Sequence, residues 1–578
     1  MRSILLFTSW LIVLPIAAQP LTTVFESSNG NATATYPQVM DYYRQLADTE
    51  AMISLKEMGM TDSGQPLHLV ILDLEGQFDF ERAREQGKTI ILINNGIHPG
   101  EPDGIEACMM LLRNYARNKE NQKWIENTLI AVIPVYNIGG ALRRNSFSRA
   151  NQNGPDEYGF RGNARNFDLN RDFVKADTKN TKSFYEIFHF VRPSIFIDTH
   201  VSNGADYQYS ITHLATQHNK MGGEMGKYIE EEFTPQLEMI MQEKGSDITP
   251  YVNVFNTTPD SNGFSQFLDD PRYSTGYTTL FHTLGFMIET HMLKKFDRRV
   301  KATYDFLETV LMIAHEEGTK INRLRQDQAK RFKAGAQHAL SWRLSKSKFK
   351  PIEFKGYQGE MIPSKVTGQE RLLYGRNKPF TKEIPYYNHY VPGVEVVIPK
   401  AYIIPQGWHR VIDRLKWNQV EYERISQDTS ITVEVYKITK YNTGSSPYEG
   451  HYRQHSVQTT VSTERVDFLK GDYVFYVDQF AGRYLVETLE PKAVDSFFSW
   501  NFFDTILQQK EYFSPYVFED VAEQLLRRNA SLRTEFEAKK KINSEFANDW
   551  YAQLDFIYKH SEYYEKAHLT YPVYRLRE

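Results

Sequence analysis

The chain has 578 residues, enough for two or more domains, and its 41% hydrophobic content can build sizeable cores. Positive and negative charges nearly cancel, at −4, so nothing indicates a nucleic-acid partner or a polybasic membrane patch. The single cysteine, Cys108, excludes an internal disulfide.

The chain begins with MRSILLFTSWLIVLPIAAQP, which has the order of a secretory signal: Arg2, an apolar run, then small residues. We predict a signal peptide over residues 1–18, cut near Ala18. The alternative is an uncleaved membrane anchor, but the apolar run is short for a bilayer span. No later segment is apolar enough to span, and the shortage of cysteine favours an exported bacterial protein, periplasmic or secreted.

An α/β region is predicted over residues 25–335. A helix over 37–48 precedes a strand, a turn and a second strand within MGMTDSGQPLHLVILDL. Four nearly continuous β-branched runs follow, at 89–95, 129–137, 194–200 and 285–291. Such runs are typical of strands buried on both faces, and helix-like segments separate them. We therefore predict a mixed, mainly parallel sheet flanked by helices.

The helix after the first of these runs is predicted to begin at Pro102. Ile105, Cys108, Met109 and Leu112 share its apolar face. This pattern makes Cys108 a core residue rather than a nucleophile.

A long charged helix over 298–339 closes the first region, and the character of the sequence changes after about residue 345. Short strand-like runs with turn signals then lie at 431–441, 455–469, 471–479 and 482–491. Helical segments follow near 517–548. We predict a β-rich accessory domain with C-terminal helices over 345–578, and the sequence assigns it no activity.

Unusual polar residues stand where the buried strands end. His98 and Glu101 follow the first run in NNGIHPGEPDG, His200 ends the third in IDTH, and Glu289 ends the fourth in MIET. Ligand sites in open α/β sheets gather at the carboxyl ends of the strands, so these segments can converge on one crevice. Each residue alone could be an ordinary polar side chain, and the joint placement carries the interpretation.

Two imidazoles and one carboxylate form a standard catalytic zinc set with a free fourth position. We therefore predict one Zn²⁺ per chain, held by His98, Glu101 and His200. Glu289 is the spare carboxylate, and it could take a proton from a metal-activated water.

The segment 143–173 is rich in arginine and asparagine. Arginine suits a carboxylate or a developing oxyanion because its planar fork binds two oxygens. The alternative is a solvated Asn/Gly-rich loop, and the sequence leaves both readings open for Arg143, Arg144, Arg161 and Arg165.

Four motifs, GIHPGEPDG, FDLNRDF, IDTH and GFMIETH, occur in the order of the M14 zinc carboxypeptidases, and residues 37–330 resemble that carboxypeptidase A-like family. The resemblance implies that His98, Glu101 and His200 bind zinc. It also implies that Glu289 is the general base and then the general acid.

The resemblance extends to the substrate. It implies that Asn170 and Arg171 hold the terminal carboxylate, and that Arg149 in FSRAN polarises the scissile carbonyl. Asp168 would orient His98, as carboxylates do for zinc-binding histidines.

The family also has a mobile tyrosine upstream of the catalytic glutamate. Counting back without gaps reaches Phe267 here, so the pattern departs from the family. Tyr273 and Tyr277 lie nearby, and we prefer Tyr273 as the residue that closes over the substrate.

The expected function is a zinc metallocarboxypeptidase that acts on peptides with a free C-terminal carboxylate. One alternative is an amide hydrolase of the same fold that acts on cell-wall peptides or N-acyl amino acids. Another is a non-catalytic binding module, which predicts the loss of at least one of the four key residues. The sequence specifies neither the preferred terminal side chain nor the oligomeric state.

Overall fold

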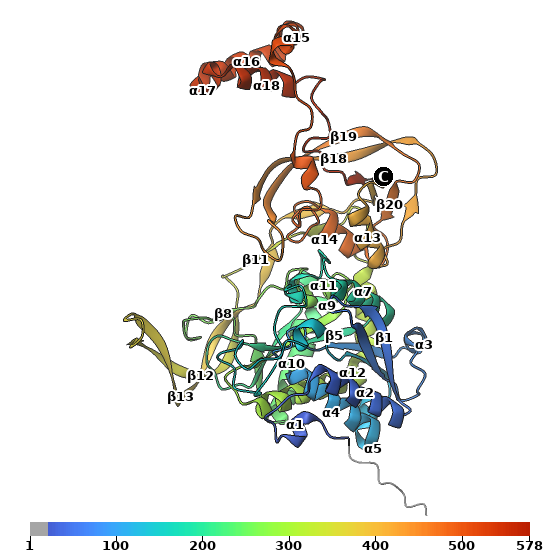
Figure 1. The fold of residues 1–578 in the computed structure, drawn as a ribbon, viewed down its shortest axis with the longest axis vertical. Helices are drawn as coiled ribbons and strands as arrows, with labels where there is room; N and C mark the ends of the chain where they lie inside the picture. The colour runs from blue at the N-terminus through green and yellow to red at the C-terminus, as the bar shows by residue number, and fades with distance from the viewer. Residues whose placement is uncertain (1–20, 578) are drawn as a thin grey trace, which may run out of the picture.

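The computed structural model describes residues 21–577 (Figure 1), so the predicted signal peptide lies outside the described residues. An α/β region at the bottom of Figure 1 carries the β-rich accessory region above it, and a group of helices stands at the far end. Within residues 21–577, no helix combines the length and the apolar character needed to cross a bilayer.

An eight-stranded sheet, in the order β1-β2-β4-β3-β5-β9-β6-β7, forms the α/β region. Its strands are β1 (Ile53–Met60), β2 (Pro66–Leu72), β3 (Thr89–Asn94), β4 (Thr128–Ile133), β5 (Ile195–Ser202), β6 (Ile211–Ala215), β7 (Ile248–Pro250) and β9 (Leu284–His291). The central strands β4, β3, β5 and β9 are parallel, whereas β1, β2 and β6 join antiparallel neighbours. The predicted mixed, mainly parallel sheet is confirmed.

Helices cover both faces of this sheet. They are α2 (Tyr36–Thr49), α4 (Asp103–Arg117) and α12 (Phe296–Ala329) on one face, and α7 (Lys179–Val191) on the other. Along β3, Ile91 and Ile93 pack into the core beneath α2, α4 and α12. Ile90 and Leu92 point to the opposite face and pack into the core beneath α7. Both faces need apolar side chains, which explains the continuous apolar run. Cys108 lies on α4 and is fully buried, so its predicted core position is confirmed.

The accessory region contains a six-stranded sheet in the order β17-β20-β16-β21-β18-β19. Its strands are β16 (Ala401–Ile404), β17 (Glu423–Arg424), β18 (Thr429–Thr443), β19 (Gln454–Phe468), β20 (Tyr473–Tyr476) and β21 (Tyr574–Leu576). The helices α15 (Pro515–Arg528), α16 (Ala530–Ile542), α17 (Ser544–Asn548) and α18 (Trp550–Lys559) are inserted before β21. The predicted strands over 431–441, 455–469 and 471–479 and the helices near 517–548 are confirmed.

The predicted strand over 482–491 is wrong, because Gly482–Leu489 forms helix α14. Every residue of this helix is buried, so the sequence shows no polar face that would mark a helical period. An ion pair between Arg483 and Glu487, one turn apart at 2.7 Å, stabilises the helix.

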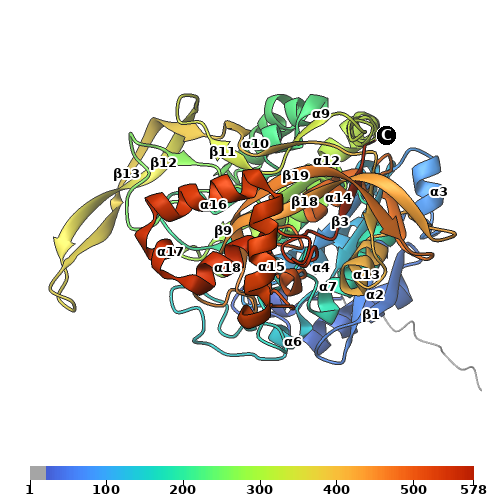
Figure 2. The same cartoon turned by 90° about the horizontal axis from the view of Figure 1, so that it is seen from above.

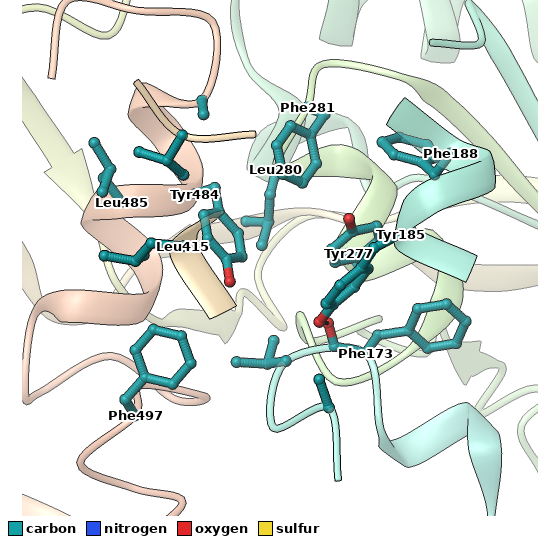
Figure 3. Close-up of a cluster of buried hydrophobic side chains, with 14 of the residues drawn as sticks. Phe173, Tyr185, Phe188, Tyr277, Leu280, Phe281, Leu415, Tyr484, Leu485 and Phe497 are labelled. Carbon is teal, nitrogen blue, oxygen red and sulfur yellow. Dashed lines mark hydrogen bonds between the residues drawn. The ribbon is translucent and has the colours of Figure 1, made fainter. Parts of the chain in front are cut away.

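The two regions share a continuous apolar core (Figure 3). Phe281 of the α/β region stacks on Tyr484 of α14 with ring centroids 5.4 Å apart. Leu415, from α13 (His409–Trp417), packs into the same cluster, which also contains Tyr277. The accessory region is therefore docked through buried aromatic side chains rather than tethered.

A long hairpin lies at the start of the predicted accessory domain. It consists of β12 (Lys350–Pro363) and β13 (Glu370–Tyr387), and it projects to one side in Figure 2. β13 pairs with β8 (Phe264–Ser265), and Phe354 and Ile384 pack with Tyr207 and Val252. The base of the hairpin thus forms a small separate core with segments of the α/β region, although it follows residue 345.

Candidate active site

Three potential metal ligands converge at the carboxyl edge of the sheet. His98 and Glu101 lie in the turn after β3, and His200 lies on β5; one ligand atom from each lies within 4.8 Å of the others, and all three residues are buried. β3 and β5 pair in parallel, which places the ends of both strands side by side. Gly104, at the start of α4, lets that helix approach β5 closely, because a Cβ there would lie 2.2 Å from the hydroxyl of Thr199.

Both imidazoles are held through their outer nitrogen. His98 Nε2 lies 2.9 Å from Asp168 Oδ1, and His200 Nε2 lies 2.9 Å from Asp198 Oδ2. The Nδ1 atoms face Glu101, at 3.3 Å and 3.1 Å from its two oxygens. A carboxylate on Nε2 keeps the proton there and leaves the Nδ1 lone pair for a cation.

The electrostatics of the site favour charged carboxylates around the two histidines. Burial opposes ionisation of Asp168, but His98 and Arg161 outweigh it and hold the pKa of Asp168 well below its usual range. Burial likewise opposes the charge on Glu101, and Arg149 and His98 reverse this effect and lower its pKa. Two imidazole nitrogens and one ionised carboxylate form a donor set that fits Zn²⁺.

Glu289 lies beside this set and differs in its ionisation. It pairs with His200 across β5 and β9, and its side chain lines the same cleft. Burial raises the pKa of Glu289 to about 7, the nearby Glu101 carboxylate adds to the rise, and His200 opposes it. A carboxyl group with this pKa can both accept and release a proton near neutral pH.

Two arginines of the segment 143–173 reach the ligands. Arg149 Nη1 lies 2.8 Å from Glu101 Oε1, and Nη2 donates to the carbonyl of Val201 at 2.9 Å. Arg161 Nε donates to Asp168 Oδ2 at 2.9 Å. Both side chains line the cleft.

The other three arginines left open by the sequence lie elsewhere in the loop. Arg143 donates to the carbonyl of Ala164, Arg144 to backbone carbonyls, and Arg165 to the carbonyl of Asp177. They brace the loop and do not line the cleft. The sequence offered no spacing that would separate Arg161 from these three.

The predicted carboxylate-binding residues form one wall of the cleft. Asp168 caps the short turn Leu169–Arg171 by accepting the backbone N–H of Asn170 at 2.9 Å. Asn170 Oδ1 in turn accepts the N–H of Ser274. The guanidinium of Arg171 lies over the Tyr273 ring, 4.5 Å from its centroid.

The two candidate tyrosines have different surroundings. Tyr273 lines the cleft and packs edge-on against Phe267, with ring centroids 5.1 Å apart. Tyr277 is fully buried and stacks on Tyr185 in the shared core, away from the cleft. Of the two tyrosines, Tyr273 therefore lies in the cleft and packs against the guanidinium of Arg171.

The whole cleft has a volume of about 430 Å³. All predicted site residues except Asp168 line this cleft. Asp168 contacts the lining residue His98 through its Nε2 atom. Sequence reasoning missed several lining residues: Asn151, Leu214, Tyr251, Phe255, Met287 and Met292. Leu214 belongs to β6, and Tyr251 directly follows β7. The sequence did not predict either of these short strands.

This geometry is a candidate metal site with a neighbouring carboxyl group at the edge of an α/β sheet, and comparison with known proteins indicates its class. Residues 39–194 match the sequence model of the family described as zinc carboxypeptidase, Peptidase_M14. Carboxypeptidase 2 of Trichophyton rubrum is 22% identical over 509 residues, which cover 84% of this chain and 87% of that protein. Carboxypeptidase 2 of Trichophyton equinum is 21% identical over 513 residues, with the same coverage of both chains.

Solved structures with similarity include a metallo-carboxypeptidase from Burkholderia cenocepacia, at 16% identity and a TM-score of 0.36, covering 48% of this chain and 68% of that chain. The carboxypeptidase A from Helicoverpa armigera gives 13% identity and a TM-score of 0.36, covering 50% and 73%.

The family match over residues 39–194 and the curated relatives support an M14 zinc carboxypeptidase region, a hydrolase, followed by an additional C-terminal region. The resemblance stated from the four motifs is confirmed.

Proposed function

We propose that this metallocarboxypeptidase holds one Zn²⁺ through His98 Nδ1, His200 Nδ1 and Glu101, and removes the terminal residue of peptides. The observation that carries the proposal is the convergence of these donors beside Glu289. When bound, zinc would supply Lewis-acid polarisation of the scissile carbonyl and would lower the pKa of water. Asp168 and Asp198 would keep the two rings aimed.

Glu289 would move the proton. It would accept one from the attacking water and pass it to the departing amine, and a pKa of about 7 suits both tasks.

The arginines would handle the negative charge of the substrate. Arg171, held over Tyr273 and beside Asn170, would grip the terminal carboxylate and so restrict cleavage to the chain end. Arg149 would stabilise the developing oxyanion, since preorganised charge is often the largest catalytic contribution. Arg161, which also lines the cleft, is a second cation available for this task.

The substitution Glu289→Gln tests the core of this proposal. We expect turnover of an N-blocked L-dipeptide to fall by at least about 10³-fold, a loss typical of a group that acts directly on the transferred proton. Zinc content should stay at one per chain, because Glu289 is not among the ligands. Most of the activity surviving in Glu289→Gln would disprove the assigned role.

The substrate class is tested with a matched panel. A peptide with a free C-terminus should be cleaved, and the same peptide with an amidated C-terminus should not, because Arg171 then lacks its anion. Preferential cleavage of D-residue cell-wall peptides or of N-acyl amino acids would favour the alternative amide hydrolase.

The remaining assignments concern organisation and export. We propose a catalytic domain over residues 25–335 and an accessory domain over 345–578, preceded by a signal peptide over 1–18 that directs the chain to a bacterial periplasm or exterior. Amino-terminal sequencing of the exported protein should show a start close to residue 19. An intact amino terminus on a membrane-bound form would favour the uncleaved anchor.

A further inference from the structure

A second cavity, of about 260 Å³, lies between the α/β region and the accessory region. Three arginines line it: Arg84 on α3 (Phe80–Glu85), Arg192 at the end of α7, and Arg325 on α12. The accessory region contributes Gln419, just after α13, and Phe480, just before α14. The cavity is thus walled by both parts of the chain and contains a concentration of positive charge.

Arg325 is the buried member of the three, with 9% of its surface exposed. Its Nε atom is buried without a hydrogen-bond partner, and Nη2 donates only to the carbonyl of Phe281 at 3.4 Å. The guanidinium lies over the Phe480 ring, 4.8 Å from the centroid. A buried charge in this state is costly unless another group neutralises it.

No carboxylate within residues 21–577 forms an ion pair with Arg325, Arg192 or Arg84. Burial lowers the pKa of Arg325 to about 9, and repulsion from the other two arginines adds to this effect. Burial and Arg192 also lower the pKa of Arg84, and the carboxylates of Glu81 and Asp79 oppose this shift. Glu421 lines the cavity as well, but it is exposed and cannot balance three cations. The cluster therefore carries an excess of positive charge.

Two residues that line the cavity, one from each region, have a left-handed backbone conformation. Arg192 has φ +48° and Gln419 has φ +51°, both in the left-handed region that favours glycine. Arg192 Nη2 donates to Gln419 Oε1 at 3.2 Å, so the two strained residues meet across the boundary between the regions. Strain of this kind persists where the surrounding structure requires it, often at ligand sites.

We propose that this cavity binds a small polyvalent oxyanion of the phosphate or sulfate type. Such an anion supplies the negative charge that the three arginines lack, and guanidinium forks match its oxygens. Arg325 provides the buried contact, and Arg192 and Arg84 close over it from the exposed side. Because the walls come from both regions, bound anion strengthens the docking of the accessory region.

The test uses the full-length, zinc-loaded protein and inorganic phosphate at 0–20 mM, with sodium chloride adjusted to hold the ionic strength constant. Calorimetric titration should show saturable binding, and Tm should rise by about 2–5 °C, since a ligand bound only by the folded state stabilises it. Sulfate should act in the same way. Binding of citrate without binding of phosphate or sulfate would overturn the proposed class of anion.

Substitutions test which residues form the phosphate site. Arg325→Met should weaken phosphate binding by at least about 10-fold, and Arg192→Ala, which changes an exposed side chain, should weaken it several-fold. Arg371→Ala removes an exposed arginine of the hairpin and should leave binding unchanged. Glu289→Gln should also bind phosphate normally, which separates this cavity from the catalytic cleft.

Two results would overturn the proposal. One is the absence of saturable binding of both phosphate and sulfate. The other is unchanged phosphate affinity in both Arg325→Met and Arg192→Ala. Loss of phosphate binding on removal of zinc would then place the anion in the catalytic cleft.

Discussion

The carboxylate of Glu449, in the accessory region, accepts the backbone N–H of Asp168 at 2.9 Å. Asp168 in turn holds His98 through Nε2, also at 2.9 Å. Only one residue therefore separates the accessory region from a proposed zinc ligand. A neighbouring contact reinforces this link, since His451 Nε2 lies 2.6 Å from Asp177 Oδ2.

The backbone around Glu449 shows that this contact is maintained against strain. Glu449 has φ +49°, where glycine is favoured, and Gly450 follows at φ +82°. A Cβ on Gly450 would lie 3.3 Å from the Phe167 ring, so the loop closely approaches the segment that carries Asp168. A glutamate held in such a conformation indicates a role for its side chain.

We expect Glu449→Gly to reduce kcat/KM about 10-fold or more, because losing an outer partner of a metal-site residue typically costs 10–100-fold in metal affinity or activity. Glycine adopts the same backbone without strain, so Tm should change little. Hydrogen exchange at the Asp168 amide should accelerate. Steady-state kinetics and exchange mass spectrometry measure the two effects.

Two controls accompany this variant. Glu449→Gln retains an oxygen acceptor and should keep most of the activity and the slow exchange. Glu423→Gln changes an exposed glutamate on β17 and should behave as the parent. Slow exchange at Asp168 in Glu449→Gly would show that the hydrogen bond does not order this segment.

A second prediction concerns Asp198, which accepts His200 Nε2 and also accepts a hydrogen bond from the Asn94 amide at 3.0 Å. We expect Asp198→Asn to weaken zinc binding about 10–100-fold, because the neutral amide no longer fixes the proton on Nε2. Competition with a chelator measures the affinity. Unaltered zinc affinity would show that His200 is oriented by its packing alone.

The third prediction follows from His189, a buried side chain between the two regions. Burial lowers its pKa to about 4, from about 6.5 in an unfolded chain. Its contribution to stability is fully present above pH 6.5 and is lost as the pH falls through 4, because the unfolded state binds the proton first. The loss amounts to about 1.4 kcal/mol per pH unit within this window.

Replacing His189 by glutamine removes this titration and retains a side chain that can bond to Asn418, which lies 3.3 Å from the histidine Nε2. The parent should therefore lose more Tm than His189→Gln between pH 7 and pH 4.5. Thermal unfolding at both pH values supplies the comparison. Equal losses would mean that other groups, such as the buried His291, dominate acid destabilisation.

The ligand set could be predicted from the sequence because its members stand at the ends of strands with continuous apolar runs. Such runs indicate that a strand is buried on both faces. His98, Glu101, His200 and Glu289 needed only the rule that parallel strands share a carboxyl edge. Arg161 needed more, since four arginines of one irregular loop look alike until the loop is folded. Tyr251 follows a strand of three residues, too short to give a periodic signal.

The accessory region was predictable in class but not in its relation to the site. Long strands such as β18 are rich in β-branched residues, whereas α14 is buried on every side and shows no helical period. The contact between Glu449 and Asp168 joins residues 281 positions apart, and no local pattern encodes such a pairing. Long-range contacts of this kind arise from the docking of two cores, which depends on shape.

The final prediction is that the α/β region does not form a stable protein on its own. Ending the chain at residue 340 would uncover Phe281 and Tyr277, which now pack beneath Tyr484 and Leu415. A large exposed aromatic patch promotes aggregation. We expect the truncated chain to be insoluble or to unfold at a much lower temperature. The control is a deletion of residues 515–559, the separate helical group with its own small core, which should leave a folded and active enzyme. A soluble, fully active 21–340 fragment would show that the shared core and Glu449 are dispensable.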